Sequence, residues 1–136
     1  KGIPNRTTVR LTDIEVLSDS TSCRLEVWRL PSNDNITGGT WEDANDDSAV
    51  QYNVGVGTNF TTTGGDLKNA TLLAANNPSG KQASSTVAFN PTSARRSYIA
   101  QNIDADDSNI FAIIVENLSD SSGTDIFNAF QWRETR

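Results

Sequence analysis

The sequence predicts an all-β protein: an antiparallel β-sandwich of jelly-roll type with about eight strands, folded as one domain over residues 1–136. Short apolar or alternating runs recur along the chain, and clusters of Gly, Asn, Asp and Pro separate them. Ser, Thr and Asn make up 43 of the 136 residues, a composition that favours sheet surfaces and turns over long helices. No helical periodicity separates the strands, which argues against a parallel α/β fold.

Eight strands are expected, and each rests on an alternating or continuous apolar pattern. In the first, residues 9–17, the apolar pattern changes phase between Leu11 and Ile14, which predicts a bulge or bend. The second alternates cleanly from Cys23 and ends at Pro31. The third places Val50, Tyr52 and Val54 on one face. In order, the expected strands are residues 9–17, 23–30, 49–54, 67–75, 85–89, 98–103, 110–115 and 126–133.

Long loops are expected at residues 58–65 and 76–80, and a short helix or 3₁₀ turn at residues 92–96. The last third of the chain gives the clearest pattern. Residues 110–115 are six apolar residues without a break, and a polar loop then leads to the terminal strand. Because Phe130 and Trp132 need burial, we expect this last strand to pair within the sheet or to lie at a subunit interface.

Composition argues against several classes of partner. The net charge is −6 and the only basic cluster is Arg95-Arg96, whereas nucleic-acid binding needs a concentrated cationic face. No run approaches 18 apolar residues, so no membrane segment is expected. The single cysteine, Cys23, lies in an alternating run and is expected to be a buried hydrophobic residue.

The sequence lacks the residues of common catalytic sites. It has no His, which excludes Ser-His-Asp and Cys-His catalysis and the usual zinc sites. It also lacks a phosphate-binding glycine loop and a dinucleotide fingerprint. Paired carboxylates on strands have an ordinary explanation as outward-facing residues. We therefore expect a protein that is not an enzyme and needs no cofactor.

Two kinds of candidate binding residue remain. Asp43, Asn45 and Asp47 copy the opening of a calcium-binding loop, but the Gly and Glu that should follow are absent, so a solvated acidic turn is the alternative. The tryptophans are the other candidates. Trp28 and Trp132 lie in apolar strands and are expected in the core or at an interface. Trp41 follows a Gly-Gly pair in an expected loop, where it would contact a ligand or pack over the sandwich edge.

Four stretches in a fixed order resemble one known group of proteins. They are Asn35-Ile36-Thr37-Gly38-Gly39-Thr40-Trp41, Asp47-Ser48-Ala49-Val50-Gln51-Tyr52-Asn53, Gly64-Gly65-Asp66-Leu67 and Phe127-Asn128-Ala129-Phe130-Gln131-Trp132-Arg133-Glu134. This order resembles C-terminal β-domains of tailed-bacteriophage virion proteins, and the resemblance spans about residues 9–136. Gln51 and Gln131 depart from the pattern, which usually has an acidic residue and Asn there.

The resemblance implies a virion structural protein without catalytic residues: a head or collar decoration, a fibre or a tail component. It implies assembly with other virion proteins and with itself, with a trimer favoured by analogy. Residues 1–8 would then be an arm or linker that follows a missing N-terminal anchor. The alternative function is a carbohydrate-binding or receptor-binding module that contacts host-surface glycans through exposed aromatic residues such as Trp41.

Overall fold

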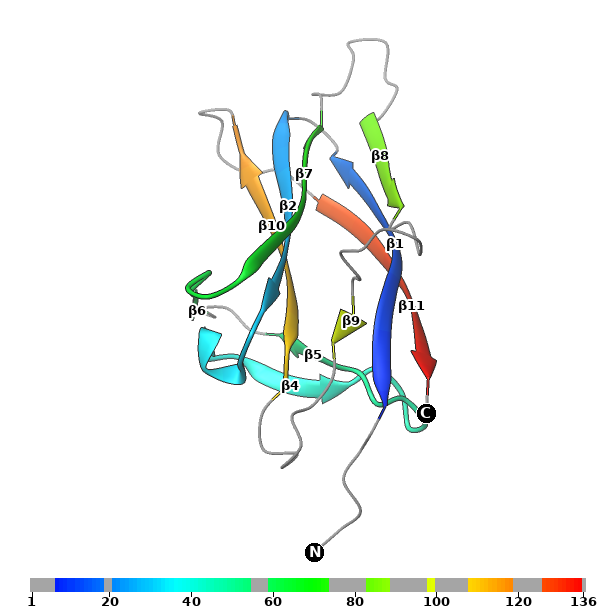
Figure 1. Ribbon diagram of the computed structural model, residues 1–136. Helices are drawn as coiled ribbons and strands as arrows, with labels where there is room; N and C mark the ends of the chain where they lie inside the picture. The colour runs from blue at the N-terminus through cyan, green and yellow to red at the C-terminus, as the bar shows by residue number, and fades with distance from the viewer. Residues whose placement is uncertain are drawn as a thin grey trace, which may run out of the picture.

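The computed structural model is a two-layer antiparallel β-sandwich, described for residues 7–18, 21–54, 59–73, 83–88, 98–99, 108–118 and 126–135 (Figure 1). Its strands are β1 (Thr8–Ser18), β2 (Cys23–Leu30), β3 (Ile36–Thr37), β4 (Thr40–Asp43), β5 (Gln51–Val54), β6 (Asn59–Phe60), β7 (Asp66–Leu73), β8 (Ala83–Ala88), β9 (Tyr98–Ile99), β10 (Ile110–Asn117) and β11 (Ile126–Thr135). A 3₁₀ turn, η1 (Asn33–Asn35), precedes β3. No helix in the described part has the length and apolarity that a membrane span requires.

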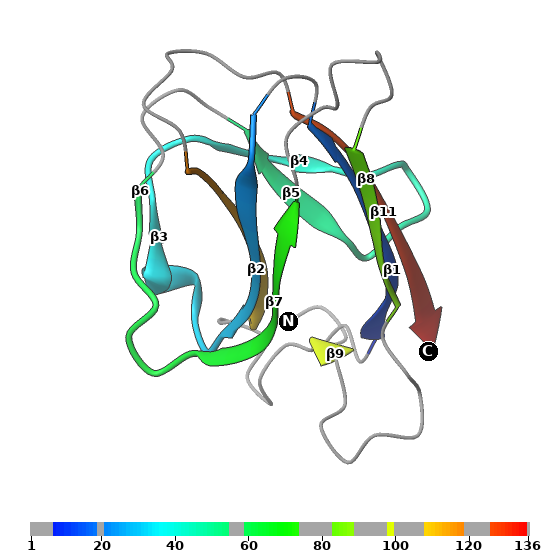
Figure 2. The same cartoon turned by 90° about the horizontal axis from the view of Figure 1, so that it is seen from above.

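Two sheets form the layers of the sandwich. The first has the order β11-β1-β8, with β9 also paired to β1, and the second has the order β10-β2-β7. Seen from above, they stand as two layers side by side (Figure 2). The first strand pairs with the last, and the second with the strand before the last. The all-β antiparallel sandwich is thus confirmed, whereas its jelly-roll form stays a prediction.

The core lies between the central strands of the two sheets. Alternate residues of β1 and β2 point inward because successive side chains of a strand face opposite sides. The buried cluster consists of Leu11, Ile14, Val16, Cys23, Leu25, Val27 and Leu73. Cys23 is buried as expected. The predicted irregularity in the first strand is also confirmed, since the register of β1 against β11 shifts between Leu11 and Asp13.

The terminal strand β11 pairs with β1 along its whole length. Phe130 lies opposite Ile14 and Trp132 opposite Leu11, so both aromatic residues are on the inward face. Each is nevertheless 38% exposed, because β11 is the last described strand on its side of the sheet. Pairing of the chain end is therefore confirmed, but the expected burial of Phe130 and Trp132 is not found within the chain, because both are exposed at the edge of the sheet.

Three short strands were not expected. Asn59–Phe60 pairs with Ile36–Thr37, although residues 58–65 were expected to be a loop. Thr40–Asp43 is a strand paired with β5, so the expectation that Trp41 lies in a loop is wrong. This segment has a single large apolar residue, and backbone pairing makes it a strand where alternation gives no signal. The expected loop at 76–80 and turn at 92–96 lie outside the described residues.

Candidate functional site

The first two of the four stretches form a hairpin, β4–β5. The second stretch of the pattern pairs with the first, with Trp41 opposite Asn53 and Glu42 opposite Tyr52. The β4–β5 hairpin runs behind both sheets in the view from above (Figure 2). It follows β2 and β3 of one side and reaches the end of β11 on the other (Figure 1). The β4–β5 hairpin therefore lies beside the terminal strand β11, although the two are far apart in the sequence.

Glycine and asparagine residues set the entry to this hairpin. Gly38 and Gly39 have φ angles of 78° and 70°, a left-handed conformation that strains residues with a Cβ. The side-chain amide of Asn53 donates to the carbonyl of Gly38 at 3.2 Å. Asn35 is buried, and its Nδ2 donates to the carbonyls of Thr61 and Thr63 at 2.9 and 3.0 Å. The positive φ angles thus account for the Gly-Gly pair of the first stretch, and the two hydrogen bonds account for its Asn35.

Glu134 fastens the hairpin to the terminal strand. Its carboxylate accepts the hydroxyl of Ser48 at 2.5 Å and the backbone N–H of Ala49 at 3.1 Å. It also accepts the indole N–H of Trp132 at 3.2 Å. Hydrogen bonds to an ionised acceptor are stronger than neutral ones, and this carboxylate collects three donors. The Glu134 contact therefore ties the second and last stretches of the pattern together.

Replacement of Glu134 by Gln is expected to loosen the hairpin. The amide keeps the size of the side chain but loses the charge, and its NH₂ group would meet a donor. We expect a loss of about 1–3 kcal/mol in the free energy of unfolding. Hydrogen exchange of the Ala49 amide should also speed up. The matched control is Glu42→Gln, an exposed carboxylate on the same hairpin, for which both measurements should change little.

The hairpin presents aromatic residues to solvent on both of its faces. Trp41 is 40% exposed and shares a face with Asn53, whereas Tyr52 is exposed on the other face. The Tyr52 hydroxyl donates to Glu42 at 3.0 Å. This hydrogen bond, the negative charge of Glu42 and slight desolvation raise the pKa of Tyr52 above 10.0. The phenol therefore stays protonated to higher pH, and its small contribution to stability is lost as pH rises through that raised pKa.

The three calcium candidates hold the turn between β4 and β5. Asp43 accepts from the side-chain amide of Gln51 at 2.8 Å, and Asn45 accepts from the backbone N–H of Asp47 at 3.0 Å. The second contact is an Asx turn. Within the described ranges, no three Asp, Glu or Cys residues form a group that could hold a metal ion. These hydrogen bonds are those of an acidic turn, and calcium binding by it stays an untested prediction.

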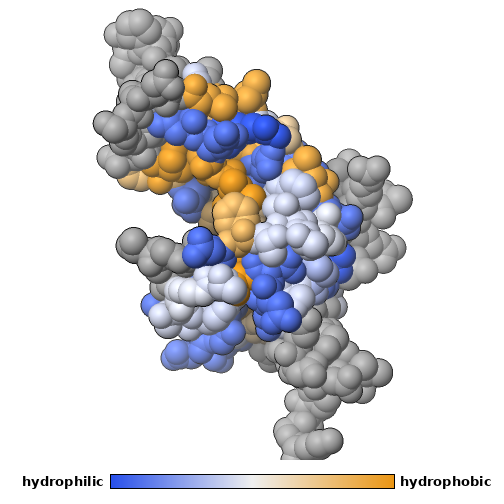
Figure 3. Space-filling view, turned by 90° about the vertical axis from the view of Figure 1, so that its left-hand side faces the viewer, coloured by the Kyte–Doolittle hydropathy of each residue, from blue (hydrophilic) through white to orange (hydrophobic). Residues whose placement is uncertain are grey.

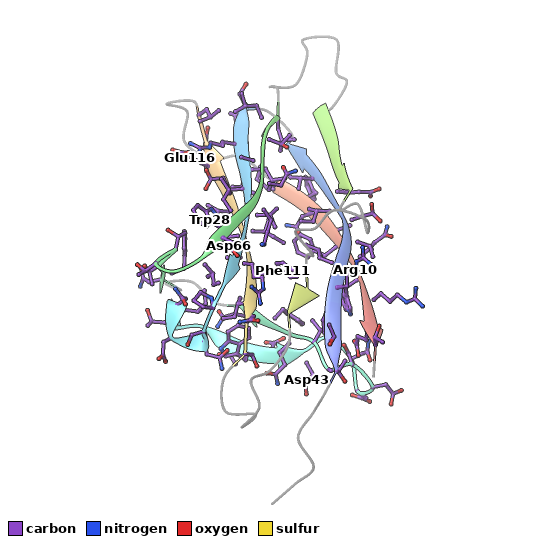
Figure 4. The ribbon with its side chains drawn as sticks, viewed as in Figure 1. Arg10, Trp28, Asp43, Asp66, Phe111 and Glu116 are labelled. Carbon is purple, nitrogen blue, oxygen red and sulfur yellow. The ribbon has the colours of Figure 1, made fainter. Side chains whose placement is uncertain are left out.

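Trp28 belongs to a second surface, whose residues could not be grouped from the sequence alone. It lies on the side of the β10-β2-β7 sheet that faces away from the core, as does Glu116 (Figure 4). The register also places Leu30 and Ile110 on this side of the sheet, where both are buried. We call the rest of this surface the outer apolar face; it consists of Arg24, Glu26, Trp28, Leu67, Ala70, Leu72, Ala112, Ile114 and Glu116. Six of these nine residues are apolar, and Leu72 is 71% exposed. Figure 3, which views the molecule from the left-hand side of Figure 1, shows apolar side chains next to a band of hydrophilic ones.

In the sequence, the unbroken apolar run of residues 110–115 indicates this face. A continuous run is typical of a strand covered on both sides. In β10, Phe111, Ile113 and Val115 pack against the core, while Ala112 and Ile114 point outward and are only half-buried. The sequence thus indicates a cover for the outward side of β10, where Ile110 is buried but Ala112 and Ile114 are not fully covered.

No family model, curated protein or solved structure matches this chain. Its function is therefore inferred from the two surfaces above.

Proposed function

We propose that this protein is a non-enzymatic structural subunit of a bacteriophage particle, which decorates the capsid or forms part of a head or tail appendage. It acts by assembly with other virion proteins and with itself. The observation that supports a role in assembly is the outer apolar face. Outward faces of antiparallel sandwiches are normally polar, and contiguous exposed apolar surface marks sites of protein–protein contact.

The assignment to a virion rests on the resemblance described above. Its support from geometry is that three of the four stretches contact one another: Ser48 and Ala49 bind Glu134, and Trp41 pairs with Asn53. Residues that hold one part of a fold together by hydrogen bonds and strand pairing are typical of a structural domain. None of these contacts needs a substrate or cofactor, which agrees with a role in assembly.

The test is the composition of the particle. Purified particles of the phage that encodes this chain should contain it in many copies, as measured by quantitative mass spectrometry. Washing at high salt should leave it attached, because apolar contacts are not screened by ions. Its absence from purified particles would refute the proposal.

Glycan binding by the β4–β5 hairpin is the second candidate function. The observation in its favour is the exposed Trp41 on one face of the hairpin. An exposed aromatic ring can stack on a sugar ring. Trp41→Ala is expected to abolish signal on a glycan array while the melting temperature stays within a few degrees. An array without signal for the unaltered protein would remove this candidate.

A further inference from the structure

We propose that a second copy of this chain covers the outer apolar face, packed face to face about a two-fold axis. This inference rests on the proposed assembly function and names the partner and the geometry for one of its surfaces. Face-to-face packing of sheets is an ordinary arrangement, with the layers about 10 Å apart. The charges and the symmetry of the face favour a second copy as the partner.

The charges in the middle of the face neutralise one another. Arg24 and Glu26 form an ion pair, and the indole N–H of Trp28 donates to Glu26 at 2.8 Å. All three side chains follow one another along the outward side of β2. Covering a lone charge is costly, whereas a paired and hydrogen-bonded one can be buried at far less cost. The face can therefore be covered without counter-charges from its partner.

The third charge of the face, Glu116, lies on β10 at the edge of the sheet, opposite Arg24 in the register. Its carboxylate is exposed and can stay in solvent when the middle of the face is covered. A charge at the rim and apolar residues at the centre are typical of protein interfaces. A strongly charged partner, such as a nucleic acid or an anionic polymer, fits this arrangement poorly.

The face is complementary to itself. Its exposed part has three rows across the sheet, and the central one is Ile114–Glu26–Ala70; the next row beyond Trp28, Ile110–Leu30, is buried. A two-fold axis along the central row puts Leu72 opposite Leu67 of the other copy. It also puts the Arg24 guanidinium over the Trp28 ring of the other copy, a favourable cation–π contact. The two Glu26 carboxylates near the axis are each neutralised by Arg24 of their own chain.

The size of the face predicts a concentration-dependent dimer. Three strands and three exposed rows cover about 14 by 20 Å, or about 280 Å² in plan. Stable interfaces bury about 800 Å² of accessible surface on each partner, so this contact is at the weak end of the range. We therefore expect two chains at high protein concentration and one on dilution.

The first experiment measures mass by light scattering over a concentration series. The unaltered chain should approach the mass of two chains, and Ile114→Lys should stay at one. The new Lys lies opposite Glu26 in its own sheet, so folding is spared, but two of them would meet at the axis. Phe127→Lys is the control: it also replaces an exposed apolar residue, but on the outward side of the other sheet, and should still form dimers.

The second experiment tests the axis itself. Chains with Leu67→Cys and chains with Leu72→Cys are mixed and treated with a short bis-maleimide; the native Cys23 is buried and protected. Cross-linked dimers should form mainly in the mixture and little in either sample alone. The inference is overturned by a single chain at every concentration, by a trimer, by dimers that survive Ile114→Lys, or by cross-links that do not favour the mixture. Any of these could occur in a genuine virion protein, so particle mass spectrometry tests the proposed function separately.

Discussion

Truncation after residue 125, which removes β11, is expected to abolish cooperative folding. β11 supplies the whole of one side of β1, with pairs from Thr8 opposite Thr135 to Ser18 opposite Ile126. Its loss also uncovers Leu11 and Ile14, since Trp132 and Phe130 lie opposite them. The anchor of the hairpin at Glu134 disappears as well. Domains are stable by only about 5–15 kcal/mol, which these combined losses exceed.

The measurement is thermal unfolding followed by circular dichroism and tryptophan fluorescence. The truncated chain should show no sigmoidal transition, whereas the full chain should show one. Phe127→Ala is the control on the same strand, because Phe127 points outward and is 55% exposed. It should change the free energy of unfolding by no more than about 0.5 kcal/mol. A truncated chain that still unfolds cooperatively would show that β11 is an accessory strand.

The long strands of this fold could be predicted because burial imposes a pattern on them. Val9 to Val16 and Cys23 to Val27 alternate since one face meets the core, and even the bulge near Leu11 leaves a visible change of phase. The short strand β4 could not be predicted. It is exposed on both faces, so no core selects its side chains, and pairing with β5 alone defines it.

The candidate site was predictable only in part. The apolar run of β10 indicates cover on two sides, but which leucines join its outward face depends on register. The pairing of β7 with β2 shifts between Val27 and Trp28, and this shift brings Leu67 opposite Trp28. The contact of Glu134 with Ser48 joins residues 86 positions apart, and no local sequence pattern predicts it. The resemblance placed both residues in one pattern without showing that they touch.

A matched pair of leucine variants tests the register of the second sheet directly. Leu25 is fully buried between the sheets, whereas Leu72 is exposed on the outer apolar face of the neighbouring strand. Leu25→Ala removes buried methyl groups and leaves a cavity, so the free energy of unfolding should fall by about 2.7–5 kcal/mol. Leu72→Ala should change it by no more than about 0.5 kcal/mol in dilute solution.

For self-association the ranking of the two variants should be reversed, with the larger effect from Leu72→Ala. Leu72 meets Leu67 of the other copy in the proposed dimer, so Leu72→Ala should raise the dimer dissociation constant several-fold while the dilute chain keeps its stability. Denaturant unfolding at low concentration and light scattering at high concentration separate these effects. Equal destabilisation by both variants in dilute solution would mean that Leu72 lies in a core, and the outward side assigned to β7 would then be wrong. An unchanged dissociation constant for Leu72→Ala would instead place the dimer contact elsewhere, because a side chain covered by a partner cannot be removed without weakening the contact.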